Sequence, residues 1–225
     1  MRSLTMADKP IIFSAQMVRA LLHGRKTQTR RVIKAAGRSP EFCGGRYDAK
    51  SDPECWGWED HERGEWITLD QWRRWNFVPF APGDRLYVRE AHAMVPSSAY
   101  RMSEGVSQAI DPSDRDRACV YREGWERCAP RWRPSIHMPR WASRLTLTVT
   151  DVRVQRLQEI SETDALAEGA MTEYGEGSVI SHRRAFNLIW NHLHGPGAWD
   201  ANPWVAAYTF TVERGNIDDL ARGNG

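Results

Sequence analysis

The sequence lacks the features that mark several large classes of protein. No run approaches the ~18 consecutive apolar residues that a membrane-spanning helix needs. Residues 1–10 hold no apolar segment before a small-residue cleavage site, as a secretory signal would. There is also no βαβ repeat and no glycine-rich phosphate loop of the nucleotide-binding folds. We therefore expect a cytoplasmic protein that has no membrane partner.

Cysteine is scarce and poorly spaced for a metal site. The chain has four cysteines, at positions 43, 55, 119 and 128, and none of them forms a Cys-x-x-Cys pair. A zinc site would need a histidine to join them at an atypical spacing. Reduced thiols in a cytosolic protein explain the pattern better, and we expect neither a metal nor another cofactor.

Charge is nearly balanced in total but unevenly distributed. The formal net charge of +2 says little about partners. Between Lys9 and Lys34, however, seven basic residues occur without an acid, whereas residues 41–65 carry eight acids and three bases. A basic block can attract a phosphate-bearing ligand. A solvated helix face gives the same composition, so charge alone leaves both interpretations open.

Apolar periodicity predicts short strands and helices scattered along the chain. Strict alternation over residues 145–150, with a change of apolar phase at Asp151, indicates a strand with a bulge or bend. We expect further strands at about 9–13, 85–90 and 204–213, and helices from Ser14 to Gly24, 161–168 and 179–193. In the last helix, Phe186, Ile189, Trp190 and Leu193 form the expected buried stripe.

The longest connections have no sustained period. We interpret residues 36–80 and 94–135 as two irregular insertions into a single domain that spans residues 1–225, and residues 214–225 as a loose tail. Within 36–80, Arg73 to Trp75 could belong to a short helix. The predicted fold is a mixed α+β protein built around a small β-barrel with flanking helices.

Three polar side chains stand out as candidates for chemistry. Lys26 and Thr29 lie three residues apart in the basic segment that follows Gly24. In an extended segment this spacing places them on opposite faces, so a turn must intervene if they share a site. Glu168 ends a predicted helix, where the helix dipole disfavours a carboxylate unless it meets a cation or performs a reaction. A solvated glutamate at a helix end is the simpler alternative.

The segment Gly-Arg-Lys-Thr-Gln-Thr-Arg-Arg at 24–31 resembles the Gly-x-Lys-x-x-x-x-Arg signature of the ASCH superfamily. Members of that superfamily have a β-barrel related to the PUA RNA-binding domain. The order of the other elements is also similar: a Pro-Gly-Asp turn before a strand, a helix that reaches Glu168, and an aromatic closing strand. The similar parts cover 9–34, 79–92 and 141–213. The whole chain resembles larger ASCH-containing proteins of phages and prophages, which implies the cytoplasm of a bacterial host cell.

The resemblance implies a catalytic set. A small bacterial enzyme of the superfamily hydrolyses N4-acetylcytidine to cytidine and acetate, and its lysine, threonine and glutamate correspond to Lys26, Thr29 and Glu168. The Thr29 hydroxyl could attack the acetyl carbonyl. Lys26 could act as the base or stabilise the oxyanion. Glu168 could position the amide or transfer a proton.

A second class of function is left open by the same resemblance, because other ASCH proteins are thought to bind or cleave RNA. The basic residues would then line a cleft for single-stranded nucleic acid, RNA before DNA. The expected phosphate-binding residues are Gly24, Arg25, Arg30, Arg31, Arg89 and Arg144. Thr29 together with Glu168 distinguishes the two classes, since a phosphate cleft needs neither. A phage module that interacts with a host protein is a third class.

Overall fold

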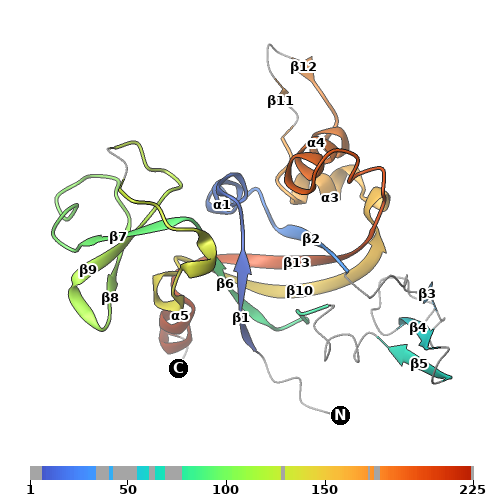
Figure 1. Cartoon of the computed structure of the whole chain (residues 1–225), viewed down its shortest axis with the longest axis horizontal. Coiled ribbons are helices and arrows are strands. Elements are labelled where there is room, and N and C mark those ends of the chain that lie inside the picture. The colour runs from blue at the N-terminus through green and yellow to red at the C-terminus, as the bar shows by residue number, and fades with distance from the viewer. Residues whose placement is uncertain are drawn as a thin grey trace. The chain divides into compact units, whose positions relative to one another are not determined.

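The computed structural model describes residues 7–33, 41–42, 55–60, 64–68, 78–127, 130–171, 173–174 and 178–223 (Figure 1). The chain forms two compact units. The first unit is made of Met1–Gly24, Gly83–Thr148 and Thr211–Gly225. The second unit is made of Arg25–Pro82 and Val149–Phe210. In the described part of the chain, no helix is long and apolar enough to cross a membrane.

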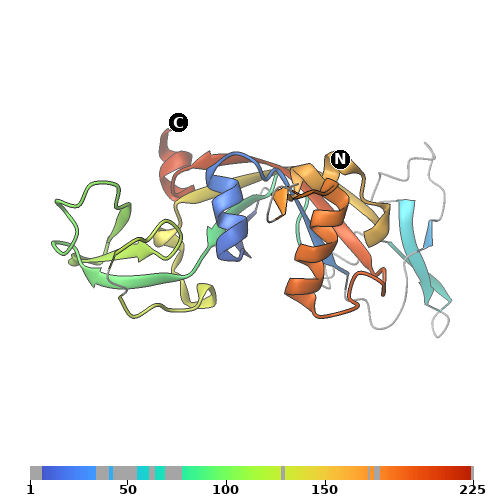
Figure 2. The same cartoon turned by 90° about the horizontal axis from the view of Figure 1, so that it is seen from above.

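The largest sheet has five strands in the order β1-β6-β10-β13-β2. Strands β1 (Asp8–Ile12) and β6 (Arg85–Arg89) belong to the first unit, and β2 (Gln28–Val32) belongs to the second. The long strands β10 (Leu145–Arg156) and β13 (Trp204–Arg214) contribute to both units, and they run side by side (Figures 1 and 2).

The change of apolar phase along β10 is confirmed. Val149 and Val152 are buried, whereas Thr150 and Asp151 between them are both exposed. Two consecutive exposed residues break the alternation of an ideal strand, as a local irregularity does. The strand continues past this irregularity to Arg156.

The expected N-terminal strand and helix are present in the first unit. Strand β1 pairs in parallel with β6, and β6 pairs antiparallel with β10. Helix α1 (Ala15–Leu22) follows Ser14 and buries Met17, Val18 and Leu21 at helical spacing. Gly24 adopts a φ of +67° directly after the helix, a conformation that glycine reaches without steric cost.

The segment 94–135, which belongs to the first unit, is not an irregular insertion. Strands β7 (His92–Pro96), β8 (Gln108–Asp111) and β9 (Asp114–Tyr121) form an antiparallel sheet in the order β7-β9-β8. Two short 3-10 turns follow, at Ser135–His137 and Arg140–Ala142. The small buried core of this sheet consists of Ala93, Val95, Ala118 and Val120. Because alanine contributes little to an apolar period, the sequence pattern did not indicate these strands.

The described parts of residues 36–80 also contain strands, in the second unit. These are β3 (Glu41–Phe42), β4 (Trp56–Asp60) and β5 (Glu65–Thr68), which pair in that order. The expectation of an irregular insertion is therefore wrong for these residues. Tryptophan and isoleucine favour strands, but acids and glycine surround them here. The short helix expected at Arg73 to Trp75 lies outside the described residues.

Two helices of the second unit confirm the expected elements. Helix α3 (Glu162–Ala167) begins after Ser161, whose Oγ accepts a hydrogen bond from the Asp164 backbone N–H at 3.0 Å. Helix α4 (His182–His194) buries Phe186 and Trp190. Contrary to the expected stripe, Leu193 in the last turn of the helix is 48% exposed, and Ile189 is half-buried. Between the two helices lies the pair β11 (Glu173–Tyr174) and β12 (Ser178–Val179).

The tail is not loose as far as residue 223. Helix α5 (Ile217–Gly223) belongs to the first unit, and Ile217 is fully buried. Asp218 Oδ1 lies 2.6 Å from Arg140 Nη2, and the Asn216 side-chain amide donates to three backbone carbonyls of residues 140–143. One apolar anchor and several polar contacts therefore order a segment whose composition is mostly polar.

The architecture is mixed α+β, as expected. Among the described residues, no strand pairing joins the two edges of the five-stranded sheet, β1 and β2. Closure into a small PUA-like barrel therefore stays a prediction, as does the expectation of one domain interrupted by insertions.

Candidate functional site

Lys26 and Glu168 meet inside the second unit although 142 positions separate them in the sequence. Lys26 Nζ lies 2.6 Å from Glu168 Oε2 and also donates a hydrogen bond to the Glu168 backbone carbonyl at 3.0 Å. Lys26 is 1% exposed and Glu168 is 4% exposed. These two groups therefore lie within hydrogen-bonding reach, and Glu168 is not a solvated glutamate at a helix end.

The position of Glu168 explains why a cation is needed there. Glu168 is the residue directly after helix α3, and Gly169 follows it with a φ of +84°. The last carbonyls of a helix lack intrahelical partners and carry partial negative charge. One ammonium group therefore compensates both the Glu168 carboxylate and the carbonyl end of α3.

Burial changes the protonation of Lys26. Removal of the ammonium from water lowers the pKa of Lys26, although the charge and hydrogen bond of Glu168 act in the opposite direction. The nearby Arg31 and Arg30 guanidinium groups lower the pKa of Lys26 further. The neutral amine is thus more accessible than in an exposed lysine, and a neutral amine can accept a proton.

Arg30 lies in the same buried network rather than on a surface cleft. Its side chain is 0% exposed, and Nη1 lies 3.1 Å from Glu168 Oε1. Nη2 lies 3.2 Å from Asp164 Oδ2, and Arg153 Nη2 approaches the other oxygen of Asp164 at 3.0 Å. The sequence interpretation missed Asp164 and Arg153 as members of this site, although Asp164 was visible as the third residue after the Ser161 helix cap.

Thr29 is placed differently from Lys26 and Glu168. It pairs across the sheet with Tyr208, so their side chains share a face of β2 that Phe80 also reaches, with ring centroids of Phe80 and Tyr208 5.1 Å apart. Gln28 and Arg30 point to the other face, as strand alternation requires. Thr29 is 4% exposed, and in the described part of the chain no hydrogen bond joins its hydroxyl to Lys26 or Glu168.

Arg31 lies two residues after Thr29 in β2, on the same face of the strand. Burial lowers the pKa of Arg31, while the charge of Glu168 and the nearby Tyr208 raise it. A shared site for Lys26 and Thr29 would need a turn between them. The turn at Gly24 instead comes before Lys26.

The expected phosphate-binding residues do not gather within one unit. Arg25, Arg30 and Arg31 belong to the second unit, whereas Gly24, Arg89 and Arg144 belong to the first. Arg89 Nε donates to the Met138 carbonyl at 2.8 Å. Arg144 pairs with a carboxylate, so Arg89 and Arg144 both have acceptors within the first unit.

The partner of Arg144 is Glu90, a second buried pair. Arg144 Nε and Nη2 lie 2.8 and 2.9 Å from the two oxygens of Glu90, and the guanidinium sits 4.1 Å from the centre of the Tyr121 ring. Burial raises the pKa of Glu90, although the hydrogen bond from Arg144 lowers it. Glu90 therefore forms an internal ion pair with Arg144.

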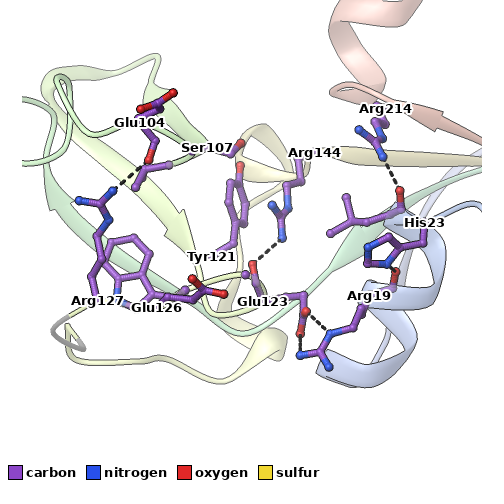
Figure 3. A pocket seen from close by; sticks show the side chains of 15 residues that line it. Arg19, His23, Glu104, Ser107, Tyr121, Glu123, Glu126, Arg127, Arg144 and Arg214 are labelled. Atoms are coloured by element: carbon purple, nitrogen blue, oxygen red, sulfur yellow. Dashed lines mark hydrogen bonds and ion pairs between the residues drawn. The ribbon is translucent and has the colours of Figure 1, made fainter.

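A cavity of about 420 Å³ lies beside this pair in the first unit (Figure 3). The charged groups of its wall are Arg19, Arg127, Arg144, Arg214, Glu104, Glu123 and Glu126. Arg19 pairs with Glu123 at 2.6 Å, and Arg127 donates to the Glu104 carbonyl at 2.9 Å. Acids and bases nearly cancel, so the wall has no strong preference for an anion. None of the three expected catalytic residues lines this cavity.

No metal site is evident in the part of the chain that the structure describes, where no group of three or more ligating side chains occurs. Cys55 and Cys119 are buried and reduced. Burial raises the pKa of Cys119 to about 12, so it stays a thiol at neutral pH. The other two cysteines lie outside the described residues.

Comparisons with protein-family models, with curated proteins and with solved structures found no match for this chain. The fold and the site define it as a mixed α+β protein with a buried lysine–glutamate pair at the end of helix α3. The similarity to the ASCH superfamily rests on the sequence motifs alone.

Proposed function

We propose that this chain is an ASCH-type protein that acts on nucleosides or nucleic acids. Within that class we propose an amidohydrolase centre formed by Lys26, Thr29 and Glu168 and directed at N4-acylated cytidine. The five-stranded sheet would supply the wall of the PUA-like barrel. The observation that carries the proposal is the 2.6 Å contact between Lys26 Nζ and Glu168 Oε2, two residues that the sequence alone singled out, one by the motif at 24–31 and the other by its place at a helix end.

The pair has the properties of an acid–base centre. Desolvation lowers the pKa of Lys26, which favours the neutral amine that a general base must present. The adjacent carboxylate can share the proton once it has been taken up. Perturbed ionisable groups that touch one another are common at catalytic sites, and structural ion pairs have them too.

The proposed reaction proceeds in two halves. The Thr29 Oγ attacks the acyl carbonyl carbon while its proton passes to the Lys26 amine, which gives a tetrahedral adduct. The bond from that carbon to N4 then breaks, and N4 takes the proton back from the Lys26 ammonium to leave as cytidine. Water hydrolyses the threonine ester to acetate and restores the hydroxyl, with Lys26 and Glu168 again moving the protons.

Access sets a condition on this mechanism. Each of the three residues is at most 4% exposed, and Thr29 faces Tyr208. Since Thr29 makes no direct hydrogen bond to the pair, its proton can reach Lys26 only through a bridging water or after the two side chains move closer together. Substrate entry therefore requires a rearrangement of the side chains that cover this end of β2.

The test is hydrolysis of N4-acetylcytidine, followed as cytidine release. Wild-type protein should turn over, and Thr29→Val should reduce kcat by roughly a hundredfold or more, because the variant keeps the volume and lacks the nucleophile. Thr27→Val is the matched control, since Thr27 is exposed and its variant should keep full activity. Absence of turnover by the folded wild-type protein on acylated cytidine ends the hydrolase proposal.

A second candidate is a protein that binds, or cleaves, single-stranded nucleic acid, RNA before DNA. The burial of Lys26 and Glu168 favours it, because surface binding needs no entry to the pair. Affinity for an RNA oligonucleotide should then fall steeply with salt, since bound phosphates release counterions. Arg25→Ala combined with Arg31→Ala should flatten that dependence, because both side chains are partly exposed and neither belongs to the buried pair, and the exposed Arg222→Ala should not. Salt-independent binding, or none at low salt, overturns it.

A further inference from the structure

Arg30 holds the central place in the buried network around Glu168. Its Nη1 contacts Glu168 Oε1 at 3.1 Å and Gln28 Oε1 at 2.5 Å, and its Nη2 contacts Asp164 Oδ2 at 3.2 Å. The side chain is 0% exposed, and its guanidinium lies 5.9 Å from the centre of the Phe186 ring. A group so enclosed cannot reach a phosphate in solvent, so its expected role as a phosphate ligand does not suit its position.

The two oxygens of Glu168 are divided between two cations. Oε2 faces Lys26 and Oε1 faces Arg30. Rotation of the carboxylate would break the contact with the Arg30 fork, whose planar donors have fixed directions. Arg30 therefore fixes the orientation of the carboxylate that faces Lys26.

Arg30 is itself held by a second carboxylate. Asp164 accepts from Arg30, from the Gln28 side-chain amide at 3.1 Å and from Arg153 at 3.0 Å. The backbone of Asp164 is fixed in the first turn of α3 by the Ser161 cap. The contacts thus run from the start of α3 through Asp164 and Arg30 to Glu168 at its end.

We infer that Arg30 is a positioning residue of the proposed hydrolytic centre, which fixes the Glu168 carboxylate against Lys26. This inference rests on the proposed function for its effect on turnover, whereas its effect on Lys26 can be measured without turnover. The charged groups that act on Lys26 are Glu168, Arg31 and Arg30, with Asp164 acting through its contact with Arg30.

Two substitutions should each lower the pKa of Lys26. Arg30→Gln releases the Glu168 carboxylate from its fixed position against the ammonium, so the pKa of Lys26 should fall although a neighbouring cation is lost; a rise would show that Arg30 acts on Lys26 through its charge alone and would overturn the inference. Asp164→Asn leaves Arg30 with one carboxylate instead of two, so its positive charge acts more strongly and the pKa of Lys26 should fall. A side chain that only fills space would produce neither shift.

The titration can be read directly, because the chain has only four lysines, at positions 9, 26, 34 and 50. Selective isotope labelling of lysine gives four side-chain NMR signals, and Lys26→Met assigns the one of interest. Arg144→Gln is the matched control: it breaks the other buried arginine–glutamate pair and should leave the Lys26 titration unchanged.

Turnover supplies the second measurement. With N4-acetylcytidine, Arg30→Gln should lower kcat roughly tenfold or more with little change in KM, because the misplaced carboxylate affects the chemical step. A rise in KM at constant kcat would instead assign Arg30 to substrate binding and overturn the inference, as would an unmoved Lys26 titration in Arg30→Gln and Asp164→Asn. If Arg30→Gln does not fold, the downward shift in Asp164→Asn decides. If wild type lacks turnover, the proposed function fails, and the titrations still test the positioning of Glu168.

Discussion

Lys26 Nζ lies 2.6 Å from Glu168 Oε2 and 3.0 Å from the Glu168 backbone oxygen, so one buried ammonium closes the carbonyl end of helix α3. The same contact joins the segment after α1 to the segment after α3 within the second unit. The pair therefore contributes to the fold of that unit as well as to the proposed chemistry.

Breaking the pair from one side should be costly. Glu168→Leu leaves Lys26 buried without its carboxylate, and removal of one partner of a buried pair costs about 3–5 kcal/mol. The double variant Lys26→Met with Glu168→Leu should recover part of that loss, because no uncompensated ammonium remains. Urea denaturation measures both free energies of unfolding. A single variant that loses under about 1 kcal/mol would show that the pair has little structural role.

The acid sensitivity of the first unit should depend on Arg140. The hydrogen bond from Arg140 lowers the pKa of Asp218 below its ordinary value of 3.8. A carboxylate with a depressed pKa in the folded state contributes stability above about pH 4, and this contribution is lost as the pH falls through the folded pKa. The wild type should therefore lose stability in this window.

The comparison variant is Arg140→Gln, which should show a shallower loss of melting temperature between about pH 5 and pH 3. Because Asp218 is 43% exposed and Arg140 is 36% exposed, solvent screens the pair and the difference should be small. Equal slopes in the two proteins would mean that Asp8, the other carboxylate bound to Arg140, and Asp218 titrate with the same pKa in the folded and unfolded chains.

Helix α5 should be an integral part of the first unit. Ile217→Ala removes a fully buried side chain and should lower the free energy of unfolding by about 2–4 kcal/mol. Asp219→Ala is the control on the same helix, since that side chain is 72% exposed and its loss should have little effect. Thermal unfolding of the two variants compares them. Equal melting temperatures would restore the expectation of a loose tail.

The sequence predicted elements whose burial depends on large apolar residues at regular spacing. Val149 and Val152 mark the irregularity of β10 in this way, as Phe186 and Trp190 mark the buried face of α4. The β7-β9-β8 sheet was missed because Ala93 and Ala118 provide much of its core, and alanine contributes little to an apolar period. The apolar periodicity of the sequence does not indicate a sheet whose core is made largely of alanine.

The candidate site was predictable only in part. A carboxylate at a helix end implied a nearby cation, and the motif indicated Lys26 as that cation. The pairing of Arg30 with Asp164 and Glu168 depends on the way α3 crosses β2, which no spacing in the sequence encodes. The separation of Thr29 from the pair follows from strand alternation, because the turn at Gly24 comes before Lys26 and not after it.

The most direct test of the account is the rate of cytidine release from N4-acetylcytidine by Lys26→Arg. Arginine keeps the positive charge beside Glu168 but cannot be deprotonated in proteins, so it cannot serve as a base. If Lys26 is the base, kcat/KM should fall by roughly a hundredfold or more while the circular dichroism spectrum shows that the variant is folded. Retention of the wild-type rate within about threefold would contradict a proton-accepting role for Lys26 and with it the proposed centre.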